Sequence, residues 1–416
     1  MRYSLLWLRS NTAKIFAIWP FLAFIFSVFD FGKQSSRITI ILFFTLLGFS
    51  MVLNRETMDG YKHSQVFEAA KDITLSNFTD EVQNILLFRS VENVDFYLYT
   101  TNFLFSRFTS DPRIIFTFHS FIFALLLVSF LGSIYDNVPG IWPTVSILIF
   151  LLLVFINPIT NVHFIRFPIG SWIFLTGAYH FIVTRKTRFI AFAFLAVIVH
   201  FAFTYAVAAL LLYAVFGNRH LIYSAVLAFS FIVPDLFYNN VSFMDASLDE
   251  GNIEKKIYAY SNEEYIETRK QGLESAAWYR AYRIQIIQYS MYVIMLIATF
   301  HALRTKRYDQ TQMNLLAFLI LLLAFVNFGF SFDSLGRRFF LVWLVLACVY
   351  LIRYFTYFSS QSLRNFSLMF LAIPVAFYVI MQLRIGLEVT SVSWFIGNIV
   401  VIIAGFIDDT ILDLAG

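Results

Sequence analysis

Stretches of about 20 apolar residues recur along the whole chain, and each can carry an α-helix across the ~30 Å hydrocarbon core of a bilayer. Because 59% of the residues are hydrophobic and 13% are charged, too little polar surface remains to cover a soluble globule of 416 residues. The sequence therefore predicts an all-α polytopic integral membrane protein. It should have about 12 transmembrane helices, within a range of roughly 10 to 14, near residues 13–31, 37–53, 113–134, 140–156, 163–183, 188–216, 221–237, 285–303, 313–332, 337–354, 366–383 and 393–408.

The charges between the apolar stretches indicate which ends of the helices face the cytosol. Three connectors are rich in Lys and Arg, namely 185–188, 304–307 and 353–364. Since positively charged short loops stay on the cytosolic side of a membrane, we place all three there. The short connector 333–337 then faces outward. Arg166, which lies at the start of its apolar stretch, faces outward as well.

Segment 188–216 is too long for one upright crossing, because a straight helix over it would measure about 43 Å. Two half-helices that meet around His200 would return the chain to the cytosolic side and make loop 238–284 extracytoplasmic. One long tilted helix would instead leave that loop inside. We favour the broken form, because irregular backbone is tolerated in a membrane where it lines a cavity.

We expect a single transmembrane domain over residues 1–416, with two extracytoplasmic loops that are long enough to fold. The first, 54–112, is predicted to hold interfacial helices, because segment 95–108 mixes aromatic and polar residues. The second, 238–284, gathers Tyr and Trp among arginines. Such rings are typical of the membrane interface, but they can also stack on sugars. Both interpretations stay open for Tyr258, Tyr260, Trp278 and Arg280.

Arg166 is the most informative polar residue, because it enters an apolar run. A charged side chain there costs roughly 2.5 to 3.5 kcal/mol on insertion scales, so it usually faces a polar cavity and an anionic partner. A structural arginine that reaches for the interface is the alternative. Arg337 and Arg338 open a later apolar stretch, and we favour Arg338 as the one that faces a cavity. Converging guanidiniums would bind a phosphate, a diphosphate or a carboxylate.

His200 lies in an apolar setting. A neutral imidazole there is a candidate general base, and a buried histidine bonded to a carbonyl is the plainer alternative. Asp59 and Tyr61 follow the second apolar stretch, where Asp-Gly also predicts a simple turn. The sequence contains no metal-ligand cluster and no glycine-rich nucleotide loop, and Cys348 is its one cysteine. A nucleotide-driven pump is therefore disfavoured.

Several short motifs follow one another over roughly residues 50–350. They are, in order, Asp59-x-Tyr61, Phe-Ile-Arg166-Phe-Pro-Ile-Gly before a basic turn, Val-His200-Phe, Tyr258, and Gly-Arg337-Arg338-Phe. Together they resemble the EpsG-like branch of the Wzy-type bacterial polysaccharide (O-antigen) polymerases. The family often has Arg-Gln after the arginine and Ser or Lys-Ser after the histidine, whereas Phe167-Pro168 and Phe201-Ala202 stand here.

This resemblance implies a multi-pass enzyme of the bacterial cytoplasmic (inner) membrane, with its active site facing the periplasm or exterior. It would join oligosaccharide repeat units carried on undecaprenyl diphosphate, with lipid diphosphate as the leaving group. Cofactors, metal ions and nucleic acid are not implied; the partners would be the lipid-linked substrate, the bilayer and a chain-length regulator protein. His200, or failing it Asp59, would be catalytic. Arg166, Arg337 and Arg338 would bind the diphosphate, and Tyr61, Tyr258, Tyr260, Trp278 and Arg280 the sugar.

Two alternatives share parts of this pattern. Another lipid-linked glycosyltransferase or an O-antigen ligase would use the same arginines with a different acceptor. A transporter or flippase should show inverted repeats or paired broken helices. One candidate broken segment is visible, and the polar residues are biased toward one side of the membrane. We therefore favour the polymerase.

Overall fold

Long apolar helices dominate the computed structural model, which describes residues 12–53, 59–87, 89–90, 95–232, 278–330, 333–405, 407 and 409–414. By length and composition, seven of the helices in these ranges are candidates to cross a membrane. They are α8 (Pro112–Asn137), α9 (Thr144–Ile156) with η3 (Ile159–Phe164), α10 (Arg166–Thr184), α17 (Trp278–Thr305), α18 (Gln310–Gly329), α19 (Asp333–Tyr357) and α20 (Gln361–Val389). The predicted all-α membrane class is confirmed.

Shorter apolar helices lie among these candidates, and the expected count of about 12 full crossings is not confirmed. They are α3 (Pro20–Phe29), α4 (Gln34–Thr45) with η1 (Leu46–Ser50), α11 (Arg188–Val199), α12 (Phe203–Phe216) and α13 (His220–Ser230). Window 13–31 divides at Pro20, because proline lacks the N–H that would continue α2 (Thr12–Ile18). Window 393–408 holds α21 (Ser393–Ile396) and α22 (Ile399–Ala404), which are too short to span.

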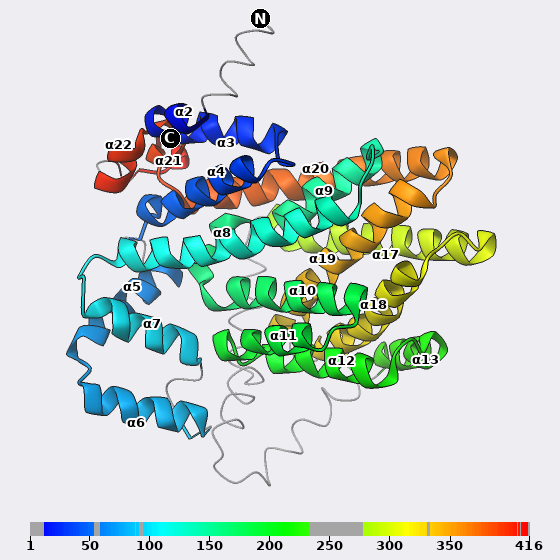
Figure 1. Cartoon of the computed structure of the whole chain (residues 1–416), viewed down its shortest axis with the longest axis horizontal. Helices are drawn as coiled ribbons and strands as arrows, with labels where there is room; N and C mark the ends of the chain where they lie inside the picture. Colours follow the sequence, from blue (N-terminus) through cyan, green and yellow to red (C-terminus); the bar gives the residue numbers. More distant parts are fainter. Residues whose placement is uncertain are drawn as a thin grey trace, which may run out of the picture.

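The three basic connectors lie together at one end of the molecule, which we call the basic end (right in Figure 1). Arg353 donates to Asp309 at 2.9 Å and to the carbonyl of Asn137 at 3.4 Å, which joins α19 to the connector 306–309 and to the end of α8. Arg185 donates to Asn218 at 3.3 Å, and Asn218 in turn donates to Asn314 at 2.6 Å. The three predicted cytosolic connectors therefore share one side.

Segment 188–216 is broken at His200, as the favoured interpretation expected. Helix α11 ends at Val199, His200 has an extended backbone (φ −153°, ψ 114°), and α12 begins at Phe203. Both outer ends of this helical pair lie at the basic end, because Arg185 before α11 bonds to Tyr213 near the end of α12 at 2.6 Å. The pair forms a hairpin whose tip is His200.

Close packing holds the hairpin against α10. A Cβ added to Gly177 of α10 would lie 2.7 Å from atoms of Ala193 and Phe189 on α11, and one added to Gly170 would lie 2.7 Å from the ring of Phe203. Small residues at such crossings allow helix backbones to approach, and van der Waals contact is the main attraction between helices in lipid. This packing fixes the tip of the hairpin relative to the start of α10.

The predicted outer loop 54–112 is largely helical in its described part. It contains α5 (Asp59–Ala69), η2 (Ala70–Asp72), α6 (Leu75–Leu86) and α7 (Phe96–Ser106), which lie opposite the basic end (left in Figure 1). Phe78 of α6 stacks on Phe103 of α7 with ring centroids 4.0 Å apart. Helix α7 also contacts α11. We call this side of the molecule the site end.

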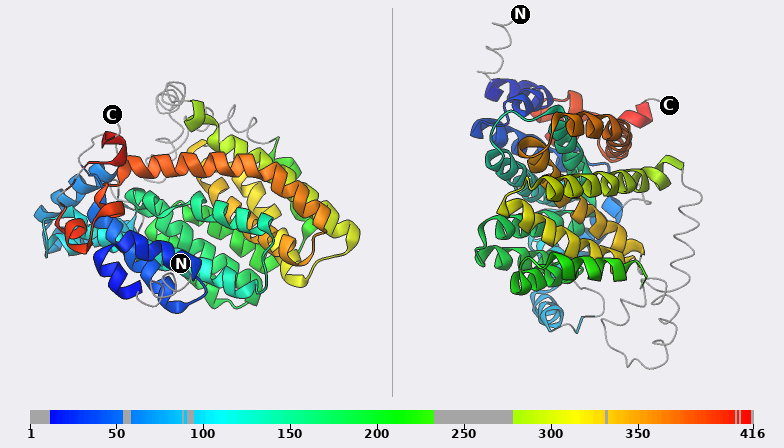
Figure 2. Two further views of the ribbon diagram at one scale, coloured as in Figure 1. Left: turned by 90° about the horizontal axis from the view of Figure 1, so that it is seen from above. Right: turned by 90° about the vertical axis from the view of Figure 1, so that its right-hand side faces the viewer.

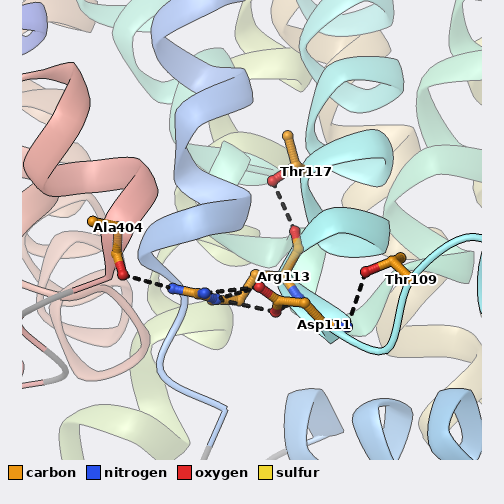
Figure 3. A network of polar contacts seen from close by, with 5 residues as sticks. All are labelled: Thr109, Asp111, Arg113, Thr117 and Ala404. Carbon is orange, nitrogen blue, oxygen red and sulfur yellow. Dashed lines mark hydrogen bonds and ion pairs between the residues drawn. The ribbon is translucent and has the colours of Figure 1, made fainter.

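The N-terminal and C-terminal helices pack together at the site end, while α20 runs along the long dimension of the molecule (Figure 2). Trp19 donates to the carbonyl of Phe395 at 2.7 Å. Arg113, at the start of α8, pairs with Asp111 at 2.7 Å and reaches the carbonyl of Ala404, the last residue of α22, at 3.5 Å (Figure 3). A cation there complements the partial negative charge at a helix C-terminus.

Candidate functional site

The carboxylate of Asp95 is the centre of a polar cluster at the site end. Its Oδ2 accepts from Arg166 Nη1 at 2.6 Å. The imidazole Nδ1 of His200 lies 3.1 Å from Oδ2 and 3.2 Å from Oδ1, and the backbone N–H of Phe201 donates to Oδ1 at 2.9 Å. One buried carboxylate therefore joins α7, α10 and the tip of the α11–α12 hairpin.

The position of Asp95 explains why its carboxylate is available to other helices. Asp95 is the N-cap residue of α7, where an aspartate usually accepts a hydrogen bond from its own first turn. Here the side chain makes no capping bond. It points instead toward α10 and the hairpin. Its carboxylate therefore contacts distant segments in place of the usual capping hydrogen bond to its own helix.

Arg166 is held by an unusual backbone turn. It is the first residue of α10, and Ile165 before it has φ 49° and ψ −75°. Positive φ is rare for a β-branched residue, and such strain often lies at functional positions. The turn ends η3 and reorients the chain, which sets the direction in which the Arg166 side chain leaves the helix.

His200 is placed by the break in segment 188–216. The rings of His200 and Phe167 of α10 pack with their planes near perpendicular and their centroids 6.2 Å apart. Phe201 N–H, which lies just past the end of α11, donates to Asp95. The sequence neighbours of His200 are apolar, but Asp95, which is distant in sequence, contacts its imidazole directly.

The charges of the cluster stabilise one another. Burial alone raises the pKa of the Asp95 carboxyl, but the hydrogen bond and charge of His200, the charge of Arg166 and the Phe201 N–H lower it to about 2. Asp95 is thus ionised at neutral pH. The Asp95 side chain is 3% exposed, whereas that of Arg166 is 39% exposed, so the arginine extends from a buried anion toward the surface.

A second group of polar residues surrounds Arg166. Burial and the nearby charge of Arg166 lower the pKa of His63 on α5 to about 4, although Asp59 acts in the opposite direction. His163 lies in η3 with its Nδ1 2.6 Å from the carbonyl of Thr160. A Cβ added to Gly60 would lie 3.8 Å from the His163 side chain, so α5 packs against η3.

Acidification is expected to destabilise the protein through His63. Because the folded pKa of about 4 lies below the unfolded value of 6.5, the unfolded chain binds more protons between these pH values. The contribution of His63 to the free energy of unfolding should therefore fall by about 2 kcal/mol at pH 5 relative to pH 7.5. The melting temperature in detergent should fall less between these pH values in His63→Gln than in the wild type. The control is His220→Gln at the basic end; equal pH slopes in both variants would contradict the prediction.

Arg338 lies close to the cluster, on α19. Its guanidinium carbon is 5.8 Å from the ring centroid of Phe167, the residue after Arg166, and its side chain is exposed. Arg337 is half-buried beside it. A cation beside an aromatic ring is attracted to it, so Phe167 helps to hold Arg338 near the cluster. The convergence of Arg338 with Arg166 stays a prediction.

The other predicted residues have different placements. Asp59 and Tyr61 lie in the first turn of α5, so the expected simple turn at Asp-Gly is a helix start. Trp278 opens α17, is 65% exposed and stacks on Phe377 with centroids 5.9 Å apart. Arg280 follows it in α17, but its side chain lies outside the described part. Tyr258 and Tyr260 also lie outside the described residues.

Asp95 is the site residue that the sequence did not single out. It appeared only as the first residue of a predicted interfacial helix, and its two partners lie 71 and 105 residues away in the chain. One signal was present: Asp95 begins a stretch of largely aromatic residues with no other carboxylate up to Phe108. Within the described ranges, His, Cys, Asp and Glu do not gather in groups of three that could hold a metal ion.

A helical membrane protein with a charged cluster at one end is the class that this fold and site define. The sequence model of the EpsG family matches residues 37–391, and the chain belongs to the EpsG family. The matched region contains Asp95, Arg166, His200 and Arg338. Membership indicates a membrane protein of polysaccharide polymerisation. No curated protein and no solved structure matches the chain.

Proposed function

We propose that this protein is a polymerase that joins oligosaccharide repeat units carried on undecaprenyl diphosphate. The observation that carries the proposal is the cluster of Arg166, Asp95 and His200 at the site end, with Arg338 beside it. The planar guanidinium of an arginine can donate two parallel hydrogen bonds to a diphosphate. An imidazole next to a carboxylate can accept a proton as a general base. The same cluster would serve O-antigen, capsule or exopolysaccharide synthesis.

The distribution of charge supports an outward-facing active site in a bacterial inner membrane. The connectors 185–188, 304–307 and 353–364 share the basic end, whereas the cluster lies at the opposite end. Under the positive-inside rule the basic end is cytosolic. Repeat units that have already been moved to the outer face would then reach the cluster there, and the reaction would use no nucleotide sugar.

The reaction transfers a glycosyl group. A hydroxyl oxygen of one lipid-linked unit attacks the anomeric carbon of the growing chain, and the bond between that carbon and the phosphate oxygen breaks. Lipid diphosphate leaves with the electron pair, while the hydroxyl proton passes to Nε2 of His200. Arg166 and Arg338, with Arg337, stabilise the charge that grows on the diphosphate, and fixed cations in a site shielded from water act strongly in this role.

The remaining predicted residues have subsidiary roles in the proposal. Asp59, which lies near His63 at the start of α5, is the alternative proton acceptor. Tyr61, Tyr258, Tyr260, Trp278 and Arg280 are the proposed sugar contacts. The exposed ring of Trp278 supports this role, because a flat apolar face with an N–H can stack on a sugar. A chain-length regulator protein is a proposed partner.

The test is chain extension by purified protein in liposomes supplied with undecaprenyl-diphosphate-linked repeat units. We expect a ladder of lipid-linked multiples and the release of undecaprenyl diphosphate. Arg338→Ala should lower the rate about 10-fold or more, because one charge-stabilising group is lost. A ligase would transfer units to another acceptor without a ladder, and a transporter would form no new glycosidic bond. Either result would reject the polymerase.

A further inference from the structure

Asp95 contacts both Arg166, the proposed diphosphate ligand, and His200, the proposed base, although its own side chain is 3% exposed. A group so buried does not meet the substrate, so any effect it has on the reaction must pass through its neighbours. We propose that Asp95 is a positioning residue, which fixes His200 as a base through one carboxylate and holds Arg166 toward the leaving diphosphate. This inference rests on the proposed polymerase function.

The contact with His200 selects the tautomer of the imidazole. An ionised carboxylate can only accept hydrogen bonds, so the Nδ1 that faces both oxygens of Asp95 carries the proton. The neutral ring then has its lone pair on Nε2. Nε2 makes no hydrogen bond in the described part of the chain, so it is available to take a proton from a sugar hydroxyl. Without Asp95 the two tautomers would compete.

The contact with Arg166 fixes one nitrogen and leaves the others available. Nη1 donates to Asp95 at 2.6 Å, and within the described ranges Nε and Nη2 have no hydrogen-bond partner. Since the arginine side chain is 39% exposed, these donors can reach a ligand at the surface. The buried carboxylate thus orients the guanidinium, and the free edge of the fork suits two phosphate oxygens.

The geometry of Asp95 is itself over-determined, which a positioning role requires. The Phe201 N–H donates to Oδ1 at 2.9 Å, so the carboxylate has a third, backbone donor that cannot rotate away. Donors from three directions fix the plane of the carboxylate. The Asp95 carboxylate therefore orients two side chains that come from different helices. Replacing a residue that orients a catalytic group commonly changes activity 10- to 100-fold or more.

Asp95→Asn separates this role from simple packing. Asparagine has nearly the same shape, and its oxygen can still accept from Phe201 N–H. Its NH2 group would then stand in place of Oδ2, where it donates to Nδ1, moves the imidazole proton to Nε2 and no longer accepts from Arg166. We expect kcat for chain extension to fall about 100-fold or more, with a smaller change in KM. Asp95→Glu keeps the charge and should recover part of the rate. The matched control is Asp111→Asn, because Asp111 is also an N-cap carboxylate paired with an arginine at the site end (Figure 3).

A double-mutant cycle gives a result that a structural role would not produce. If Asp95 acts in part through His200, adding Asp95→Asn to His200→Gln should lower kcat by a smaller factor than Asp95→Asn does in the wild type, because only the contribution through Arg166 is left to lose. The proposal would be overturned if the double variant lost kcat by the full product of the two single factors, or if Asp95→Asn kept the wild-type kcat. Either result would leave the polymerase assignment intact. Failure of the proposed function would appear earlier, as the absence of a ladder with wild-type protein, and would overturn both.

Discussion

Arg166→Ala is expected to lower the rate of chain extension by about 1000-fold or more. The variant removes the donor that we propose for the leaving diphosphate, and a single such donor is commonly worth a factor of 100 to 1000. It also removes one of the three groups that contact the 3%-exposed Asp95 carboxylate, so the variant should be less stable, with His200 and Phe201 N–H as the remaining partners. Both effects lower the amount of polymer that the variant makes.

The measurement is the rate of chain extension per folded protein, with melting temperatures recorded in parallel. Arg166→Lys separates the two effects, because lysine keeps a cation near Asp95 but lacks the planar fork. We expect it to recover stability and to remain slow. Arg188→Ala is the control, since Arg188 likewise opens a helix but lies exposed at the basic end. Arg166→Ala protein that makes full-length polymer at the wild-type rate would remove the arginine from the mechanism.

His200→Gln is expected to lower kcat by about 100- to 10,000-fold, the usual range for loss of a general base. Glutamine can still donate from its amide to Asp95, so the tip of the hairpin should stay in place. KM for the lipid-linked substrate should change little, because the arginines that we propose to bind the diphosphate are unchanged.

Single-turnover extension with pre-bound substrate would measure this step directly. His180→Gln is the matched control, because His180 lies on α10 with its Nε2 3.2 Å from Ser133, outside the Asp95 cluster. A His200→Gln protein with unchanged kcat would mean that another group accepts the proton, and Asp59 would be the next residue to replace.

The membrane class and the arrangement of the basic connectors could be predicted, because both follow from local composition. Long apolar runs specify helices, and the basic connectors at 185–188, 304–307 and 353–364 marked one end before any contact was known. The break at His200 followed from a length argument, since the segment exceeded one membrane thickness. Single spanning helices were expected over 13–31 and 393–408, but both windows divide into shorter helices. Apolar content alone does not fix the length of a helix, and Pro20 divides the first window.

The candidate site was only half predictable. Arg166, Arg338 and His200 stood out because charged or titratable groups in apolar runs are rare. Asp95 did not, since an aspartate before a helix is ordinarily explained by capping. Its true partners come from distant segments, and the turn at Ile165 contradicts the local preference of a β-branched residue. Tertiary contacts overrode local rules at both positions.

The hairpin of α11 and α12 also constrains the order in which the protein can assemble. Asp95 emerges first during synthesis, but its histidine partner lies 105 residues later, at the tip of a segment that enters from the basic end. Until that segment has inserted, the carboxylate has neither His200 nor the Phe201 N–H as a partner. Contacts so far apart in sequence form late in folding. The contacts of Asp95 are therefore completed only after the α11–α12 hairpin has inserted, so a copy truncated before His200 cannot carry the cluster.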